Sequence, residues 1–250
     1  MRTSIICLIY RSTDYARYFY ECLRRYTPEL GVDADFLFVA NDATGEVQRF
    51  LRARGYPHII ADNDHFTDAE LAAKGFAFPE YISRVYQGVN KGMLHASGDE
   101  IVLMNSDNFV SPGWLQNLRK RLDKSRVVSP TLVQPHAAFP NPINQSLSLV
   151  KDCGLGLTTF REDDFVKWAE TIKRDSWSVG NPFMPVLLYK WQAELVGLYP
   201  TGNLAGKDFS EIRHTGDTFF FLKLALAGIQ HITVGDSIVY HLQEGEKYGK

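Results

Sequence analysis

Short apolar runs and stretches with helical periodicity alternate along the first 133 residues of the chain. A short continuous apolar run predicts a buried strand, whereas apolar residues that recur every three or four positions predict an amphipathic helix. The strands predicted in this way cover residues 4–10, 35–40, 58–61, 101–104 and 127–133. The predicted helices cover residues 14–26, 80–96 and 112–122, with another after Thr44 and a brief one capped by Thr67 and Glu70. Because strands alternating with helices favour a parallel sheet covered on both faces, the predicted fold class is α/β with a Rossmann-like, mostly parallel sheet flanked by helices.

This alternation is lost after residue 133. Residues 134–158 contain several prolines and no sustained period, which predicts an irregular insertion over the site. A helix capped by Thr159 and Glu162 is expected next, followed by a strand that passes into a helix over 187–195. The remaining expectations are a loop over 197–206, an apolar run over 219–227, and late strands over 232–234 and 237–240, with His241 just beyond.

A cluster of polar residues follows the apolar run 101–104 directly. Asn105, Ser106 and Asp107 are expected to emerge together at the carboxyl end of this strand, where open α/β sheets bind their ligands. The Asp107 carboxylate is the hard oxygen ligand that a divalent cation bridging a diphosphate requires. The same residue types also form turns for purely local reasons. The stretch therefore predicts either a metal and phosphate site or a simple polar turn.

Composition and charge restrict the class of protein. The 250 residues are 45% hydrophobic and 22% charged, enough to bury a substantial core. A net charge of -2 and the lack of a Lys/Arg run leave no electrostatic footprint for nucleic acid or an anionic membrane surface. Cys7, Cys22 and Cys153 form no disulfide framework and fit a reducing, cytoplasmic location. No signal peptide is predicted, and no stretch approaches the about 20 apolar residues of a transmembrane segment.

Five short motifs occur in an order that resembles a known family. They are Asn90-x-Gly92, Ala96-x-Gly98, Asn105-x-Asp107 with Pro112, Val196-Gly197-Leu198-Tyr199, and Gly216-Asp217 with the helix that ends at Gly228. Their order and spacing resemble the GT-A glycosyltransferases, specifically the large family 2 type. The resemblance implies one GT-A domain over residues 1–250, with a nucleotide-sugar-binding half over 1–133 and an acceptor-binding, catalytic-base half over 134–250. It covers most of the chain except residues 134–180, where acceptor choice is expected to reside.

The resemblance assigns roles to residues that would bind the donor. Asn105 and Asp107 stand where the family carries Asp-x-Asp, which holds Mn2+ or Mg2+ against the sugar-nucleotide diphosphate. Asn105 removes one negative charge, so lower cation affinity is expected. Asp42 matches the acid that accepts from the base or ribose. Tyr10 stands where the base is flanked, although it also suits the edge of a core, and Asn90 matches a position near the nucleotide but also suits a helix surface.

The resemblance also assigns the catalytic base and a further metal ligand. Asp217 matches the acid that removes the acceptor proton in an inverting transfer, and Asp is also common at a helix N-cap. Gly216 and Phe219 depart from the family by replacing acidic residues. His241 matches a histidine that completes metal ligation in some members, whereas a lone histidine at a strand end is often structural. Asp208 and Glu211 are alternative acids, and Trp114, Trp177 and Trp191 suit either sugar stacking or core positions.

Together these roles predict a glycosyltransferase. It would move a sugar from a nucleoside diphosphate sugar to an acceptor hydroxyl on a glycan, a lipid-linked sugar or another molecule, with Mn2+ or Mg2+ as cofactor. Two alternatives stay open. A nucleotidyltransferase would need a Gly-rich loop after the first strand, and residues 10–13 contain no glycine. A non-catalytic nucleotide-sugar or glycan-binding module is compatible with Asn105, Gly216 and Phe219.

Overall fold

The computed structural model of the chain describes residues 1–61, 78–136, 148–180, 182–200, 216–243 and 245–246, and of residues 78–82 the backbone alone. Its centre is one sheet in the order β3-β2-β1-β4-β9-β6-β10-β5, with β7 beside β6 and β8 beside β10. The strands are β1 (Thr3–Ile9), β2 (Ala34–Ala40), β3 (His58–Ile60), β4 (Glu100–Asn105), β5 (Asn108–Val110), β6 (Arg126–Gln134), β7 (Ser148–Val150), β8 (Trp177–Val179), β9 (Val186–Tyr189) and β10 (Gln230–His241).

The part of the sheet built from the first half of the chain is parallel. Strands β3, β2, β1 and β4 all run in the same direction, and Ile6 of β1 pairs with Leu37 on one side and Leu103 on the other. Side chains of β1 alternate between the two faces, so a strand that is buried on both faces needs a continuous apolar run. The carboxyl ends of β1, β2 and β4 consequently lie at one edge of the sheet.

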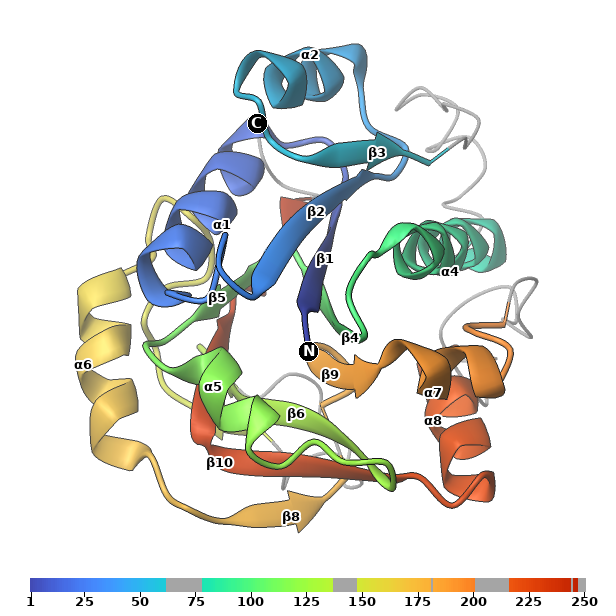
Figure 1. The fold of residues 1–250 in the computed structure, drawn as a ribbon. Coiled ribbons are helices and arrows are strands. Elements are labelled where there is room, and N and C mark those ends of the chain that lie inside the picture. Colours follow the sequence, from blue (N-terminus) through green and yellow to red (C-terminus); the bar gives the residue numbers. More distant parts are fainter. Residues whose placement is uncertain (62–77, 137–147, 181, 201–215, 244, 247–250) are drawn as a thin grey trace.

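Helices cover both faces of this sheet, and each face has its own apolar core (Figure 1). One face packs against α1, α2, α5 and α6, and the other against α4, α7 and α8. The helices are α1 (Thr13–Tyr26), α2 (Gly45–Ala53), α4 (Phe78–His95), α5 (Trp114–Arg119), α6 (Glu162–Ile172), α7 (Lys190–Leu195) and α8 (Gly216–Leu226). The three-layer arrangement confirms the predicted fold class.

Two glycines of the motifs allow close packing on the parallel strands. A Cβ on Gly92 of α4 would lie 2.6 Å from Ile6 Cγ2 and 2.8 Å from Val39 Cγ2. A Cβ on Gly98, in the turn before β4, would lie 2.6 Å from the Arg2 carbonyl oxygen. Both contacts are shorter than carbon and oxygen atoms tolerate, so glycine lets α4 and the following turn approach the sheet.

The second half of the chain completes the same sheet. Strand β9 lies between β4 and β6 and is antiparallel to both. Strand β10 is parallel to β6 and antiparallel to β5 and β8. The two halves therefore share one sheet and do not separate into independent bodies.

Several element predictions need correction. Thr159 does not cap α6, because its Oγ1 accepts from the amides of Leu155 and Gly156, and the helix begins at Glu162 after Arg161. The two late strands are one strand, β10, with a register shift between Val234 and Ile238. Its last residue is His241, which therefore lies within the strand. Helix α5 is shorter than predicted, β5, β7 and β8 were not predicted, and the Thr67 cap lies outside the described residues.

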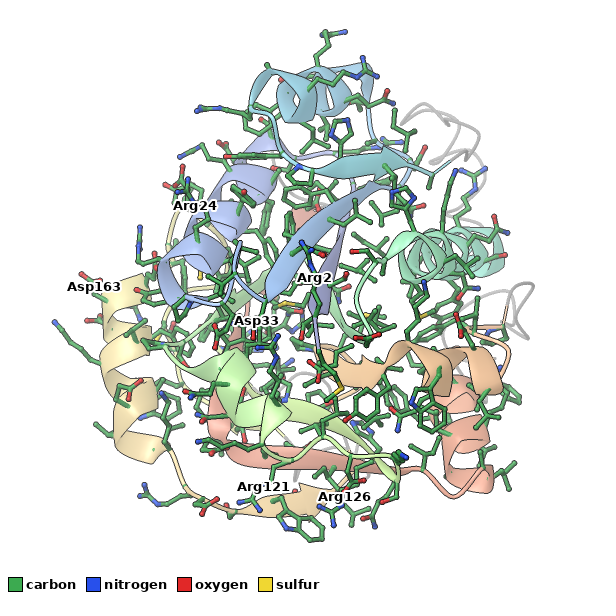
Figure 2. All side chains as sticks on the ribbon, in the orientation of Figure 1. Arg2, Arg24, Asp33, Arg121, Arg126 and Asp163 are labelled. Carbon is green, nitrogen blue, oxygen red and sulfur yellow. The ribbon has the colours of Figure 1, made fainter. Side chains whose placement is uncertain are left out.

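Many charged side chains lie on the outside of the molecule, and one cluster lies at the amino edge of the sheet. Figure 2 shows Arg24 on α1 and Asp163 on α6 pointing away from the core. At the amino edge, Arg119 of α5 donates to Thr3 Oγ1 at 3.0 Å, to Glu100 Oε2 at 3.2 Å and to Asp33 Oδ2 at 3.0 Å. This fork joins α5 to the starts of β1 and β4, at the sheet edge opposite the predicted site. None of the described helices is long and apolar enough to cross a membrane.

Candidate functional site

Polar residues follow β1, β2 and β4 at the carboxyl edge of the sheet, as predicted. Asn41 donates its backbone N–H to the Ile9 carbonyl at 2.9 Å, which places the turn after β2 beside the turn after β1. Asp42, the next residue, has a φ of 52° and a buried carboxylate that lies 3.2 Å from the Arg11 guanidinium. Asp accepts this left-handed conformation more readily than most residues, and such positions are common at functional sites. Asp42 and the end of β1 therefore lie side by side at the carboxyl edge of the sheet.

Asp107 lies in the tight turn between β4 and β5. Asn108 holds this turn by accepting the Asn105 backbone N–H at 3.1 Å through its Oδ1. The stretch is thus a polar turn, and it also places Asp107 beside the end of β10. Because His241 pairs with Asn108 in the sheet register, its ring lies next to Asp107.

Asp107 and His241 lie in contact, and their remaining groups suit a cation when the imidazole is neutral. His241 Nε2 lies 3.3 Å from Asp107 Oδ2, and His241 Nδ1 lies 3.1 Å from Gln134 Nε2. Burial lowers the pKa of His241, but the attraction of Asp107 and a hydrogen bond with it outweigh burial and leave that pKa above its usual value. Asp107 Oδ1 is buried and has no hydrogen-bond partner among the described residues.

This donor set fits a divalent cation that also binds phosphate. The described residues contain no group of three or more His, Cys, Asp or Glu side chains placed to hold a metal. In phosphate chemistry Mg2+ is usually held by one or two carboxylates together with substrate oxygens and water, and Asp107 would supply such a carboxylate. The imidazole of His241 would be a further ligand for a transition metal such as Mn2+. For His241 to bind through Nε2, its proton must be on Nδ1, and Gln134 would then present its amide oxygen.

Asp217 is the second residue of α8 and lies in an aromatic environment. Its backbone N–H donates to the Tyr86 hydroxyl at 3.2 Å, and its Oδ1 is buried with no hydrogen-bond partner in the described part of the chain. Burial raises the pKa of Asp217 to about 6, although the hydroxyls of Tyr199 and Tyr86 lower it in part. A carboxyl with this pKa is ionised near neutral pH but still accepts a proton readily.

Steric crowding explains why the residue before Asp217 is a glycine, Gly216. A Cβ on Gly216 would lie 2.2 Å from Cε2 of the Tyr86 ring. The ring of Tyr86 therefore fills the space that the acidic side chain expected at this position would need. Tyr199 stacks on Tyr86 with ring centroids 5.1 Å apart, so the loop containing Tyr199 packs around the same aromatic group.

Asp217 stands at the carboxyl edge of the sheet but on the α4 flank. Helices α4 and α8 each lead back to the start of the next strand, so their amino ends lie near the carboxyl ends of strands. Gly88, half a turn beyond Tyr86 in α4, approaches Asn41, since a Cβ there would lie 3.0 Å from Asn41 Oδ1. In the described residues, Asp217 makes no hydrogen bond or ion pair with Asp107 or His241.

The remaining predicted residues occupy defined positions. Both polar groups of the Asn90 side chain bond the Tyr199 backbone at 2.9 Å, so Asn90 holds that loop, and a nucleotide contact through its amide would require the loop to change. Tyr10 is half-buried, with the Arg11 guanidinium 4.7 Å from its ring centroid. Trp114 is fully buried and donates to Thr27, so it is a core residue. Trp177 and Trp191 are exposed, and Asp208 and Glu211 lie outside the described residues.

One residue at this edge was not predicted. Glu246 accepts the backbone N–H groups of Tyr10, Arg11 and Ser12 and the hydroxyl of Ser106. It belongs to no periodic element, and 234 residues separate it from Ser12. A sequence pattern carries no signal for a contact of this kind.

Comparison with known proteins identifies the fold. The chain has the GT-A fold of glycosyltransferases. A crystal structure of GalNAc-T7 with UDP, GalNAc and Mn2+ matches 96% of the chain and 44% of its own chain, with a TM-score of 0.59 and 11% identity. The mannosyltransferase PcManGT from Pyrobaculum calidifontis, in complex with GDP-Man and Mn2+, matches 99% and 58%, with a TM-score of 0.58 and 14% identity. TarS residues 1–349 from S. aureus match 96% and 60%, with a TM-score of 0.58 and 12% identity.

The sequence match is narrower than the structural one. Residues 83–172 match the family described as glycosyl transferase family 2, which confirms the predicted family 2-like resemblance over that range. The chain spans about half the length of the solved structures that it resembles. No curated protein matches its sequence at a significant level.

Proposed function

We propose that this chain is a glycosyltransferase that moves a sugar from a nucleoside diphosphate sugar to an acceptor hydroxyl, with inversion at the anomeric carbon. The observation that carries the proposal is the Asp107–His241 pair at the carboxyl edge, with Asp107 Oδ1 buried and lacking a described partner. Solved structures with the same fold contain UDP or GDP-Man together with Mn2+. These complexes support UDP- and GDP-sugars as the first donors to test.

The donor would lie across the ends of β1, β2 and β4. Asp42 would accept from the base or ribose, and Tyr10 would flank the base. Asp107 and His241 would hold Mn2+ or Mg2+, and Asn105 would add its amide oxygen to a ribose or a metal-bound water. When bound there, the cation supplies positive charge against the negative charge that develops on the departing diphosphate.

Asp217 would act as the general base. The acceptor oxygen forms a bond to the anomeric carbon while the bond from that carbon to the diphosphate oxygen breaks. The hydroxyl proton passes to Asp217, and the bonding electrons leave with the diphosphate. A pKa raised to about 6 by burial favours this step, because the carboxylate is ionised at neutral pH and basic enough to accept the proton.

The test is transfer and donor hydrolysis by purified protein with UDP- and GDP-sugars and Mn2+. Asp107→Ala and Asp217→Asn should each lower turnover by about 10²-fold or more, and chelation of the cation should abolish it. Asp163→Asn is the matched control, because Asp163 is exposed on α6 and points away from the core (Figure 2). Unchanged rates in both site variants would contradict the proposed roles. Nucleotide binding with no turnover in any variant would favour the non-catalytic binding module instead.

A further inference from the structure

The carboxylate of Glu246 is held by the turn between β1 and α1. Tyr10 N donates to its Oε2 at 3.0 Å and to Oε1 at 3.1 Å. Arg11 N and Ser12 N donate to Oε2 at 2.7 Å and 3.0 Å, and the Ser106 hydroxyl donates to Oε1. Three consecutive backbone N–H groups therefore bind one carboxylate, and Ser106 fixes it from the side of β4.

The hydrogen bonds to the Glu246 carboxylate are favoured by electrostatics. The N–H groups of residues 10–12 lie just before α1, and the partial positive charge at the amino end of a helix favours an anion there. Hydrogen bonds from N–H groups to an ionised carboxylate are stronger than those between neutral groups. Burial raises the pKa of Glu246, whereas the bonds from Ser106, Ser12, Arg11 and Tyr10 lower it.

The chain that carries Glu246 passes over Asp107. We call Leu242, Gln243, Gly245 and Glu246 the closing segment. Its first residue donates its backbone N–H to the Asp107 carbonyl at 2.9 Å. A Cβ on Gly245 would lie 3.4 Å from Asp107 Oδ2, so this residue packs directly on the carboxylate assigned to the cation. Leu242 and Gly245 therefore contact the turn after β4, and Glu246 contacts the residues that follow β1.

The position of the closing segment coincides with that of the proposed donor. Glu246 lies between the Asp107–His241 pair and Arg11, whose guanidinium pairs with Asp42. A nucleoside diphosphate that contacts both Asp42 and a cation on Asp107 must cross the same space. It is also an anion, and it would bring its acceptor oxygens to the same backbone N–H groups. The carboxylate and the nucleotide cannot occupy this place together.

We propose that Glu246 is an internal competitor of the donor, so that the closing segment must leave the Tyr10–Ser12 amides before a nucleoside diphosphate can bind. This inference rests on the proposed function, because it takes the same edge as the donor site. Apparent donor affinity is then reduced by the fraction of molecules in which the site is closed. Removing the carboxylate removes the competition and leaves Asp42, Asp107 and His241 in place.

The experiment compares wild type with Glu246→Ala and Glu246→Gln. Glu194→Ala is the matched control, since Glu194 is an exposed residue on α7 at the amino edge of the sheet. Binding of UDP and of GDP, each with Mn2+, is measured by calorimetry, and backbone amide exchange at residues 10–12 is measured without nucleotide. Glu246→Ala should expose these amides to faster exchange and tighten binding of one nucleotide by about 10-fold or more. Glu246→Gln should give a smaller change in both, because its amide keeps one acceptor oxygen, and Glu194→Ala should change neither.

Each outcome bears on a different step. Nucleotide binding by Glu246→Ala that is no tighter than by wild type would overturn the competition and leave the proposed function standing. Weaker binding would mean that Glu246 itself contacts the donor. Unchanged amide exchange at residues 10–12 would show that the carboxylate does not hold these groups. If UDP and GDP bind neither wild type nor Glu246→Ala, the proposed function and the competition both fail.

Discussion

Burial determines what Asp217 can do. Desolvation raises its pKa to about 6, and the hydroxyls of Tyr199 and Tyr86 moderate that effect. A general base works only when ionised, so kcat/KM measured at saturating Mn2+ should fall about tenfold per pH unit below about pH 6. Tyr199→Phe removes a group that lowers the pKa and keeps the ring that stacks on Tyr86. The pH below which kcat/KM falls should therefore be higher in Tyr199→Phe than in wild type.

The measurement is a pH profile of transfer for wild type, Tyr199→Phe and Tyr18→Phe. Tyr18 is an exposed residue of α1, so its variant controls for the loss of a hydroxyl elsewhere. An acid limb that stays near the same pH in Tyr199→Phe would show that another group sets the profile.

A second prediction concerns the affinity of the Asp107–His241 pair for a cation. A ligating imidazole must be neutral, and Asp107 holds the pKa of His241 above its usual value. Mn2+ binding should therefore weaken as the pH falls below that pKa, because protons compete for Nε2. Gln134→Ala should also weaken binding by roughly 10- to 100-fold, since Gln134 orients the ring from Nδ1.

Titration of Mn2+ by calorimetry at two pH values tests this prediction. His241→Ala should weaken Mn2+ binding more than Gln134→Ala does. His58→Ala is the control, because His58 lies in β3 and bonds the Tyr56 carbonyl. Equal affinities in wild type and His241→Ala would remove the imidazole from the ligand set.

Residue roles were predictable from the sequence to different degrees. Asp107 follows an apolar run, and that pattern alone predicts its place at the end of a strand. The place of His241 beside Asp107 was predicted only through the family resemblance. No local pattern pairs His241 with a residue more than a hundred positions earlier. The contacts of Glu246 were not predictable, since they depend on the residues after β10 lying against the turn between β1 and α1.

At the scale of elements, α4 and α8 meet through Gly216 and Tyr86. A Cβ on Gly216 would overlap the Tyr86 ring, so Gly216→Ala should push α8 away from α4 and destabilise the protein by about 1–3 kcal/mol. Gly45→Ala is a close control, because Gly45 is also the first residue of a helix. Its Cβ would meet only the flexible end of Arg49 at 3.3 Å. The control should be neutral or slightly stabilising.

Denaturant unfolding of both variants measures the difference. Loss of transfer in Gly216→Ala beyond its loss of stability would further indicate that Asp217 has moved. Equal stability of the two variants would mean that Tyr86 can rotate away at little cost.

The elements themselves were mostly predictable where one local signal determined them. Strands β1, β2, β3, β4 and β6 and helices α1 and α4 lie close to their predicted ranges, because buried strands and amphipathic helices leave clear periods. Thr159 looked like a helix cap, but its hydroxyl bonds the amides of the preceding turn. Strand β8 has only three residues, all exposed, and exists because it pairs with β10. Such pairing is a property of the whole sheet and leaves no local pattern.

At the scale of the whole molecule, one sheet contains strands from both residues 1–133 and residues 134–250. Strand β9, from the second half, lies between β4 and β6 of the first half, and β10 pairs with both β5 and β6. Removing the second half would expose the edges of β4, β5 and β6 and one side of both cores. Residues 1–133 should therefore not fold alone, and the full chain should unfold in a single transition. Calorimetry checks this expectation, since the calorimetric and van't Hoff enthalpies should agree, and added UDP or GDP with Mn2+ should raise the midpoint without splitting the transition. Two separate transitions, or a folded 1–133 fragment, would show that residues 1–133 and 134–250 are energetically independent despite sharing the sheet.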